Sequence, residues 1–203
     1  MHATPLRTAL LAVALQWLPA ATLNADTYLI DTDGMHASIQ FRIQHLGYSW
    51  LYGRFNDFSG SFSYDAAQPE ASWVKVTINT ASIDSNHAKR DKHLRDEEFL
   101  NVSRYPEATF ASTGVQWHSA DALTLSGQLT LRGVTRDVVI EATKVGSGPD
   151  PWGGFRVGFS GTTRIALKDF GIDKYLGPAS TTLELLLDIE GIRQDPRKAG
   201  KRS

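Results

Sequence analysis

The sequence predicts a mainly β protein, an antiparallel β-barrel of about eight strands with a helical segment across one end. Most of the chain consists of segments of about ten residues in which apolar and polar side chains alternate, as in strands with one buried face. Short turns join most of these segments. One long stretch, residues 84–110, lacks the alternation and is rich in helix formers. Because an open sheet of such strands would leave two exposed edges, closure into a barrel is expected.

The first predicted strands carry the clearest alternation. In the second of them the apolar side chains share one face with His45. The third is rich in aromatic residues and is interrupted by Gly53 and Gly60. Glycine within a strand often marks the bulge or bend that curls a sheet into a barrel. We expect these strands at residues 28–30, 36–46, 50–64 and 72–83.

The helical segment is predicted over about residues 86–100, as a cover for one end of the barrel. Asp84, Ser85 and Asn86 are the candidate N-caps, and Pro106 separates the segment from the next strand. Neighbouring opposite charges suggest surface ion pairs, which would contribute about 0–1 kcal/mol each. These pairs are Arg90 with Asp91 and Arg95 with Asp96.

The rest of the domain again alternates in strand fashion. A Gly-rich stretch at residues 146–154 is the most loop-like part of the chain, and residues 168–180 are irregular. The remaining strands are expected at residues 108–117, 122–132, 136–145, 155–167 and 181–191.

Composition narrows the class of protein. The 203 residues fit one domain, which we place at residues 26–192, and 41% of them are hydrophobic, enough for a sizeable core. The formal charge of −1 argues against nucleic-acid binding, which favours a basic protein. Cysteine is absent, which excludes disulfides, thiolate metal sites and a cysteine nucleophile.

The N-terminus resembles a Sec-type signal peptide of residues 1–25. Arg7 precedes a short apolar run at residues 9–18, and the cut is expected after Ala25, or alternatively near residues 20–21. A membrane anchor is the other interpretation, but the run is shorter than the roughly 20 residues of a spanning helix. We therefore expect export to a bacterial periplasm.

The C-terminal residues 193–203 are basic and lack large apolar side chains, which predicts a disordered tail. Such a tail leaves room for a transient contact with the anionic head groups of a membrane surface.

No catalytic constellation is recognisable. The histidines are scattered, and none has the spacing of a metal site. His87 and His93 lie six residues apart, which places them on different faces of a helix. A nucleophile elbow and a phosphate-binding loop are both missing. We therefore expect neither a metal nor a cofactor.

The aromatic residues suggest an apolar tunnel inside the barrel, the alternative being an ordinary filled core. Burying about ten methylene groups would contribute about 8 kcal/mol, close to micromolar affinity before ordering costs. Three polar residues are candidates for a ligand's head group: His45, Arg90 and His93. Alternatively, His45 belongs to the core and the charged helix simply faces solvent. The candidate lining is Ile39, Phe41, Ile43, Phe55, Phe58, Val76, Ile78, Leu94, Phe99, Phe110, Phe155, Val157 and Phe159.

Several long motifs, in order, resemble the YceI-like family of exported bacterial proteins over residues 26–191. They are FRIQHLGYSWLYGRF (41–55), RDKHLRDEEFLN (90–101), YPEATFAST (105–113), LTLRGVTR (129–136), DPWGG (150–154), and KDFGI (168–172) followed by LGPAS. No motif of the family is missing, and the unusual features lie outside the motifs: the longer basic tail after residue 191 and the poor residue at the expected cleavage site. The resemblance implies a lipocalin-like, eight-stranded antiparallel barrel that binds a polyisoprenoid, a quinone-like molecule or another long-chain amphiphilic lipid. It is also compatible with a homodimer.

Three hypotheses follow. The first is a non-enzymatic lipid-binding protein for carriage, storage or stress protection. The second is an enzyme acting on a lipid or quinone, which would need a converging pair among His45, Asp57, Asp91, His93 and Asp169. The third is a stress-response interaction protein with a filled barrel.

Overall fold

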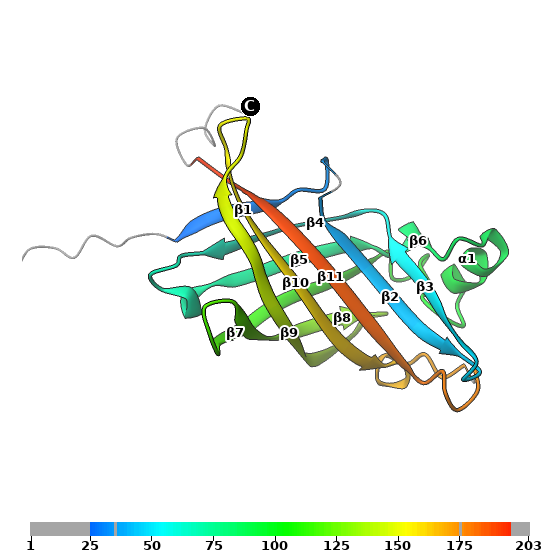
Figure 1. The fold of residues 1–203 in the computed structure, drawn as a ribbon. Coiled ribbons are helices and arrows are strands. Elements are labelled where there is room, and N and C mark those ends of the chain that lie inside the picture. Colours follow the sequence, from blue (N-terminus) through cyan, green and yellow to red (C-terminus); the bar gives the residue numbers. More distant parts are fainter. Residues whose placement is uncertain (1–24, 35, 175, 196–203) are drawn as a thin grey trace, which may run out of the picture.

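The computed structural model describes residues 25–34, 36–174 and 176–195, which form an antiparallel β-barrel with one α-helix at its end (Figure 1). The strands are β1 (Asp26–Ile30), β2 (Ser38–His45), β3 (Ser49–Phe55), β4 (Phe58–Tyr64), β5 (Trp73–Asn79), β6 (Ile83–Asp84), β7 (Glu107–Trp117), β8 (Ala122–Leu131), β9 (Val134–Pro149), β10 (Phe155–Ala166) and β11 (Thr182–Arg193). The helix is α1 (Ala88–Arg95), and short 3₁₀ turns occur at η1 (Pro69–Ala71), η2 (Thr80–Ser82) and η3 (Leu167–Phe170).

These strands make a closed barrel of eight long strands. Three of the long strands are each interrupted and consist of two pieces: β1 with β2, β3 with β4, and β5 with β6. Accordingly, β4 pairs with β1 and β5, whereas β3 pairs with β2 and β6. At the closing seam β11 pairs with β10 on one edge and with both β2 and β1 on the other. The predicted eight-stranded antiparallel barrel is confirmed.

The barrel has two different ends. At one, which we call the helix end, lie the β2–β3 hairpin, α1 with the loop that follows it, the β8–β9 turn and η3. At the other, the far end, lie η1, the β7–β8 and β9–β10 turns and the first residues of β1. Figure 1 shows α1 at the right-hand end of the barrel, beside β3 and β6.

The helix is shorter than expected and its N-cap is a different residue. Only Ala88–Arg95 is helical, and residues 97–104 form turns that begin where Asp96 becomes extended. In these turns Phe99 and Leu100 are buried, as part of the hydrophobic core. The N-cap is His87, whose Nδ1 accepts a hydrogen bond from the Arg90 amide at 3.2 Å.

The two expected ion pairs on this segment are wrong, because both arginines bind backbone oxygens instead. Arg90 donates to the carbonyl of Ser85 at 2.6 Å. Arg95 donates to the carbonyls of Ala81 and Ile83 at 2.7 and 2.6 Å. The guanidinium groups thus fasten α1 to the chain that precedes it.

The last strand extends two residues further than expected. β11 includes Arg193, which pairs with Asp26 at 3.1 Å, and the Gln194 amide donates to the carbonyl of Thr27. The predicted signal peptide, apart from Ala25, and residues 196–203 of the predicted tail lie outside the described residues. Among the described residues, no helix has the length and apolar character needed to cross a membrane.

Candidate functional site

The barrel interior holds a cavity of about 480 Å³, within the usual range for small-molecule sites. Its wall is made almost entirely of inward-facing aliphatic and aromatic side chains from all around the barrel. Besides Tyr64 and Trp117, the lining residues with polar side chains are Gln44, His45, Ser63, Ser72, Arg90, His93, Ser160, Thr163 and Ser180.

The tips of two phenylalanine rings lie over glycines of neighbouring strands. Phe41 lies over Gly53, directly opposite it in the β2–β3 pair, and a Cβ at Gly53 would overlap the ring. Phe110 covers Gly127 of β8 in the same way. Such aromatic–glycine pairing is a known way of filling the gap that glycine leaves in a sheet. The rings therefore form part of the wall and leave space at the centre.

Aromatic rings close the cavity toward the far end. The Phe159 ring lies edge-on to those of Phe62 and Tyr64, with ring centroids 5.7 and 5.9 Å apart. Tyr64 in turn contacts Trp117 at 5.9 Å, and the Trp117 Nε1–H donates to the carbonyl of Pro69 in η1 at 3.1 Å. Since edge-to-face contacts of this kind are favourable, this layer forms a rigid floor.

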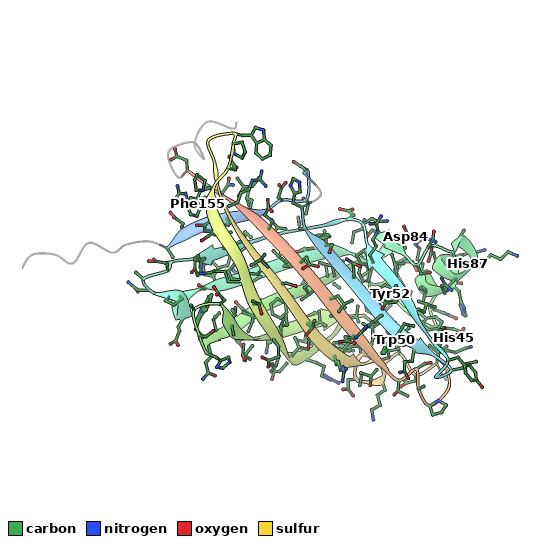
Figure 2. All side chains as sticks on the ribbon, viewed as in Figure 1. His45, Trp50, Tyr52, Asp84, His87 and Phe155 are labelled. Carbon is green, nitrogen blue, oxygen red and sulfur yellow. The ribbon has the colours of Figure 1, made fainter. Side chains whose placement is uncertain are left out.

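The cavity opens at the helix end. Of all the lining residues, only His45, Leu46 and His93 are exposed, and all three belong to the β2–β3 hairpin or to α1. Figure 2 shows His45 at this end of the barrel and Phe155 at the opposite end. An elongated ligand would therefore enter beside α1 and extend toward the aromatic floor.

A charged group borders this mouth. The His93 Nε2–H donates to Glu98 Oε2 at 2.8 Å, and Lys174 Nζ donates to Glu98 Oε1 at 2.7 Å. The hydrogen bond from Lys174, followed by that from His93, lowers the pKa of Glu98, so the carboxylate is ionised. The His93 ring also lies edge-on to Phe99, with centroids 4.9 Å apart.

A buried carboxylate holds the start of the helix segment at the mouth. Asp91 is 7% exposed and accepts hydrogen bonds from the Ser85 amide at 2.8 Å and from the Ser85 hydroxyl. Arg90 Nε donates to the same hydroxyl at 2.7 Å. This network fixes Arg90 where its side chain also lines the cavity.

Thirteen of the sixteen predicted site residues line the cavity. They are Ile39, Phe41, Ile43, His45, Phe55, Val76, Ile78, Arg90, His93, Leu94, Phe99, Phe110 and Phe159.

Phe58, Phe155 and Val157 do not line it. Because β10 runs from the far end, Phe155 and Val157 come before Phe159 of the aromatic layer and lie beyond the floor of the cavity. Val157 is fully buried there, and the Arg193 guanidinium covers the Phe155 ring at 4.6 Å. Phe58 is 9% exposed and packs in the filled core where β3 bends into β4.

Sequence reasoning missed two groups of residues. The leucines of β8 and β11, such as Leu129 and Leu185, line the cavity, and their alternation along the chain was a sufficient signal. Glu98 and Lys174 at the mouth lie 76 residues apart in the chain. No sequence pattern indicated that these two would meet.

The pairs that catalysis would need do not form between the candidate residues. Among the described residues, no hydrogen bond joins any two of His45, Asp57, Asp91, His93 and Asp169. The ring of His45 makes no hydrogen bond within that part of the chain.

Outside the cavity, Asp31, His36 and Glu190 approach one another as metal ligands do. A guanidinium already lies between their charges, because Arg156 Nη1 binds Asp31 Oδ2 at 2.6 Å and also binds Glu190. Burial opposes ionisation of Asp31, but hydrogen bonds from Arg156, His36 and the Gly34 amide outweigh it and lower the pKa of Asp31 to about 2. The cluster is a structural ion-pair network.

Comparison with known proteins agrees with this architecture. A family model described as a YceI-like domain matches residues 28–191. A UPF0312 protein of Azotobacter vinelandii is 56% identical over 186 residues, covering 92% of this chain and 97% of the relative. A UPF0312 protein of Pseudomonas aeruginosa is 58% identical, with the same shares covered.

Solved structures share the fold. Burkholderia cenocepacia BcnA aligns with a TM-score of 0.71 at 18% identity, covering 79% of this chain and 98% of BcnA. The Campylobacter jejuni YCEI protein aligns with a TM-score of 0.69 at 28% identity, covering 75% of this chain and 91% of that one. A domain from Saccharophagus degradans, described as polyisoprenoid binding, aligns with a TM-score of 0.60 at 16% identity, covering 82% of this chain and 98% of that domain. On the family match and the relatives together, the chain belongs to the YceI-like family.

Proposed function

We propose that the protein is a non-enzymatic binding protein that holds a polyisoprenoid or quinone-like lipid in its barrel, for carriage, storage or stress protection. The observation that carries the proposal is the 480 Å³ interior cavity with an apolar wall and a polar rim at its mouth. The description of the Saccharophagus degradans domain as polyisoprenoid binding supports the same ligand class.

The lining suits a hydrocarbon chain better than a polar metabolite. A buried polar group without a hydrogen-bond partner costs about 1–3 kcal/mol in a protein, and this wall offers few partners. Each buried methylene contributes about 0.8 kcal/mol, so a chain of ten methylenes gives about 8 kcal/mol, close to micromolar affinity before ordering costs. An open cavity of this size also argues against the filled-barrel alternative.

The rim would orient the head group of the lipid. The His45 ring has no hydrogen-bond partner among the described residues, so its N–H is available to donate to an oxygen of the ligand and its other nitrogen to accept from a hydroxyl. His93 already binds Glu98, and Arg90 is held by Ser85. We therefore assign head-group contact to His45 first, with Arg90 and His93 beside it.

The test is mass spectrometry of an organic extract of the purified protein, compared between two tryptophan variants. Val76→Trp fills the cavity from the inner face of β5, whereas Val139→Trp adds the same bulk on the outer face of β9, where Val139 is 52% exposed. We expect a long-chain lipid from the wild type and Val139→Trp and a depleted extract from Val76→Trp. Absence of lipid from all three proteins would refute the proposal.

Export to the periplasm forms part of the proposal, because residues 1–25 have the composition of a signal peptide. Fractionation of expressing cells and N-terminal sequencing of the mature protein test it. A mature chain that begins near Asp26 and is recovered from the periplasm is expected. A full-length chain in the cytoplasm would contradict export without affecting the ligand.

A further inference from the structure

The β2–β3 hairpin presents a cluster of large apolar side chains to solvent. Leu46 is 52% exposed, Tyr48 88%, Trp50 42% and Tyr52 50%. These four lie within seven consecutive positions and make up half of the eight large hydrophobic residues that are exposed in the described part of the chain. Single exposed apolar residues are ordinary, but a contiguous cluster indicates an interaction.

This cluster is continuous with the cavity. Leu46 lines the cavity mouth and is exposed at the same time. It also has a φ of 52°, in the left-handed region that glycine or asparagine normally fills. An apolar side chain in an unfavourable backbone conformation is thus held at the edge of an apolar cavity. Figure 2 shows Trp50 and Tyr52 on the strand that leads away from this tip.

We propose that the tip of this hairpin, Leu46, Tyr48 and Trp50, inserts into the surface of a lipid bilayer, so that the cavity mouth faces the membrane. The inference rests on the proposed function, because a lipid that moved between bilayer and cavity through water would lose the burial of its chain. Tyrosine and tryptophan are the side chains that favour the interface between bilayer and water. A mouth in contact with head groups would keep the chain covered throughout transfer.

A second copy of the chain is a poorer partner for this surface. Stable protein interfaces involve about 20–30 residues on each side, far more than the tip of one hairpin offers. Two aromatic rings and a leucine are enough to penetrate between head groups, but they offer little surface for packing against another protein.

Insertion rather than charge should drive the contact. Residues 41–55 contain Arg42 and Arg54 and no Asp or Glu. However, Arg42 pairs with Glu184 at 2.8 Å, and Arg54 lies opposite Asp84 in the β3–β6 pair. Arg42 is therefore paired, and Arg54 has a carboxylate on the neighbouring strand, whose pKa is lowered by a backbone hydrogen bond and also by the charge of Arg54. We expect binding to neutral phosphatidylcholine vesicles, with only a small increase when anionic phosphatidylglycerol is added.

The test is co-sedimentation with phosphatidylcholine vesicles, with and without phosphatidylglycerol. We compare the wild type with Tyr48→Ser and with the double variant Tyr48→Ser/Trp50→Ser. Trp152→Ser is the matched control, since Trp152 is 76% exposed in the β9–β10 turn at the far end. Binding should fall by about 30-fold in the double variant and remain unchanged in the control. Tyr48→Ser, which alters an almost fully exposed side chain, should give part of the loss without risk to folding.

Three results would overturn the proposal: equal vesicle binding by all four proteins, binding that requires phosphatidylglycerol, or a wild-type dimer in sedimentation that becomes a monomer in the double variant. Mass spectrometry of extracts separates this inference from the proposed function. A wild type that carries lipid but ignores vesicles would refute only the docking inference. A wild type that binds vesicles through the hairpin but carries no lipid would refute only the proposed function.

Discussion

Gly53→Ala should reduce the space for a ligand without unfolding the barrel. Gly53 does not have a positive φ, so alanine adds only a methyl group. The three atoms nearest to that methyl are Cζ, Cε1 and Cε2 of the Phe41 ring, and the two Cε atoms would lie at 2.7 and 2.9 Å. None of the three is a backbone atom. The ring can turn away, and the open side is the cavity. We expect a loss of stability near the lower end of the roughly 1–3 kcal/mol that overpacking costs.

The effect on binding should be larger than the effect on stability. If the displaced ring takes the place of about four methylenes of the guest, at about 0.8 kcal/mol each, affinity falls by about 3 kcal/mol, or about 200-fold. The assay is titration with an environment-sensitive dye that carries a long alkyl chain, together with urea denaturation.

Two further variants make the test of Gly53 specific. Gly146→Ala is the matched control, because nothing lies within 4 Å of a Cβ at that position. Adding Phe41→Leu to Gly53→Ala should restore most of the dye binding by removing the displaced ring. Wild-type affinity in Gly53→Ala, or a structure of that variant in which the Phe41 ring has not moved, would refute this reasoning.

Other substitutions test the remaining parts of the structure. Asp91→Ala should lower the free energy of unfolding by about 2 kcal/mol and raise hydrogen exchange in residues 85–95, because Ser85 loses its buried acceptor. Asp96→Ala is the control, since Asp96 is exposed. Equal exchange rates in the two variants would contradict the role of Asp91. The lowered pKa of Asp31 stabilises the fold above about pH 4, and this contribution is lost as the pH falls toward 2. Asp31→Asn should therefore be about 2 kcal/mol less stable at pH 7 in urea denaturation, and a gap that stayed constant down to pH 2 would contradict the linkage. Ser72→Ala should be neutral or stabilising by about 1 kcal/mol, because the buried Ser72 hydroxyl has no partner, and a clear loss of melting temperature would show that it has one.

The sequence predicted the barrel well because the alternation in its strands is strong. Ile39, Phe41 and Ile43 occupy every second position of β2, and each lines the cavity. Because successive side chains of a strand point to opposite faces, the odd or even position of a residue, its parity, decides whether it points inward. Parity does not say how far along the barrel a residue lies. Phe155 and Val157 have the same parity as Phe159, yet they lie beyond the aromatic floor.

The helix end was predicted less well, because its structure depends on contacts distant in sequence. The helix stops at Arg95, although strong helix formers follow it, since the turn there lets Phe99 and Leu100 reach the barrel. His87 is the N-cap in place of the three expected residues: Ser85 binds Asp91, Asp84 accepts from the Asn86 amide, and Asn86 has a φ of 60° rather than the extended backbone of an N-cap. Specific contacts overrode local propensity in both cases.

The seam between β11 and β1 has a consequence for folding. The first and last strands of the barrel pair with each other, so the wall cannot close before the twelve residues of β11 have left the ribosome. Until then every apolar inner face remains open, and folding must wait for the pairing of segments at opposite ends of the chain, a topology that folds slowly. A chain that ended before β11 would be expected to aggregate rather than form a smaller barrel.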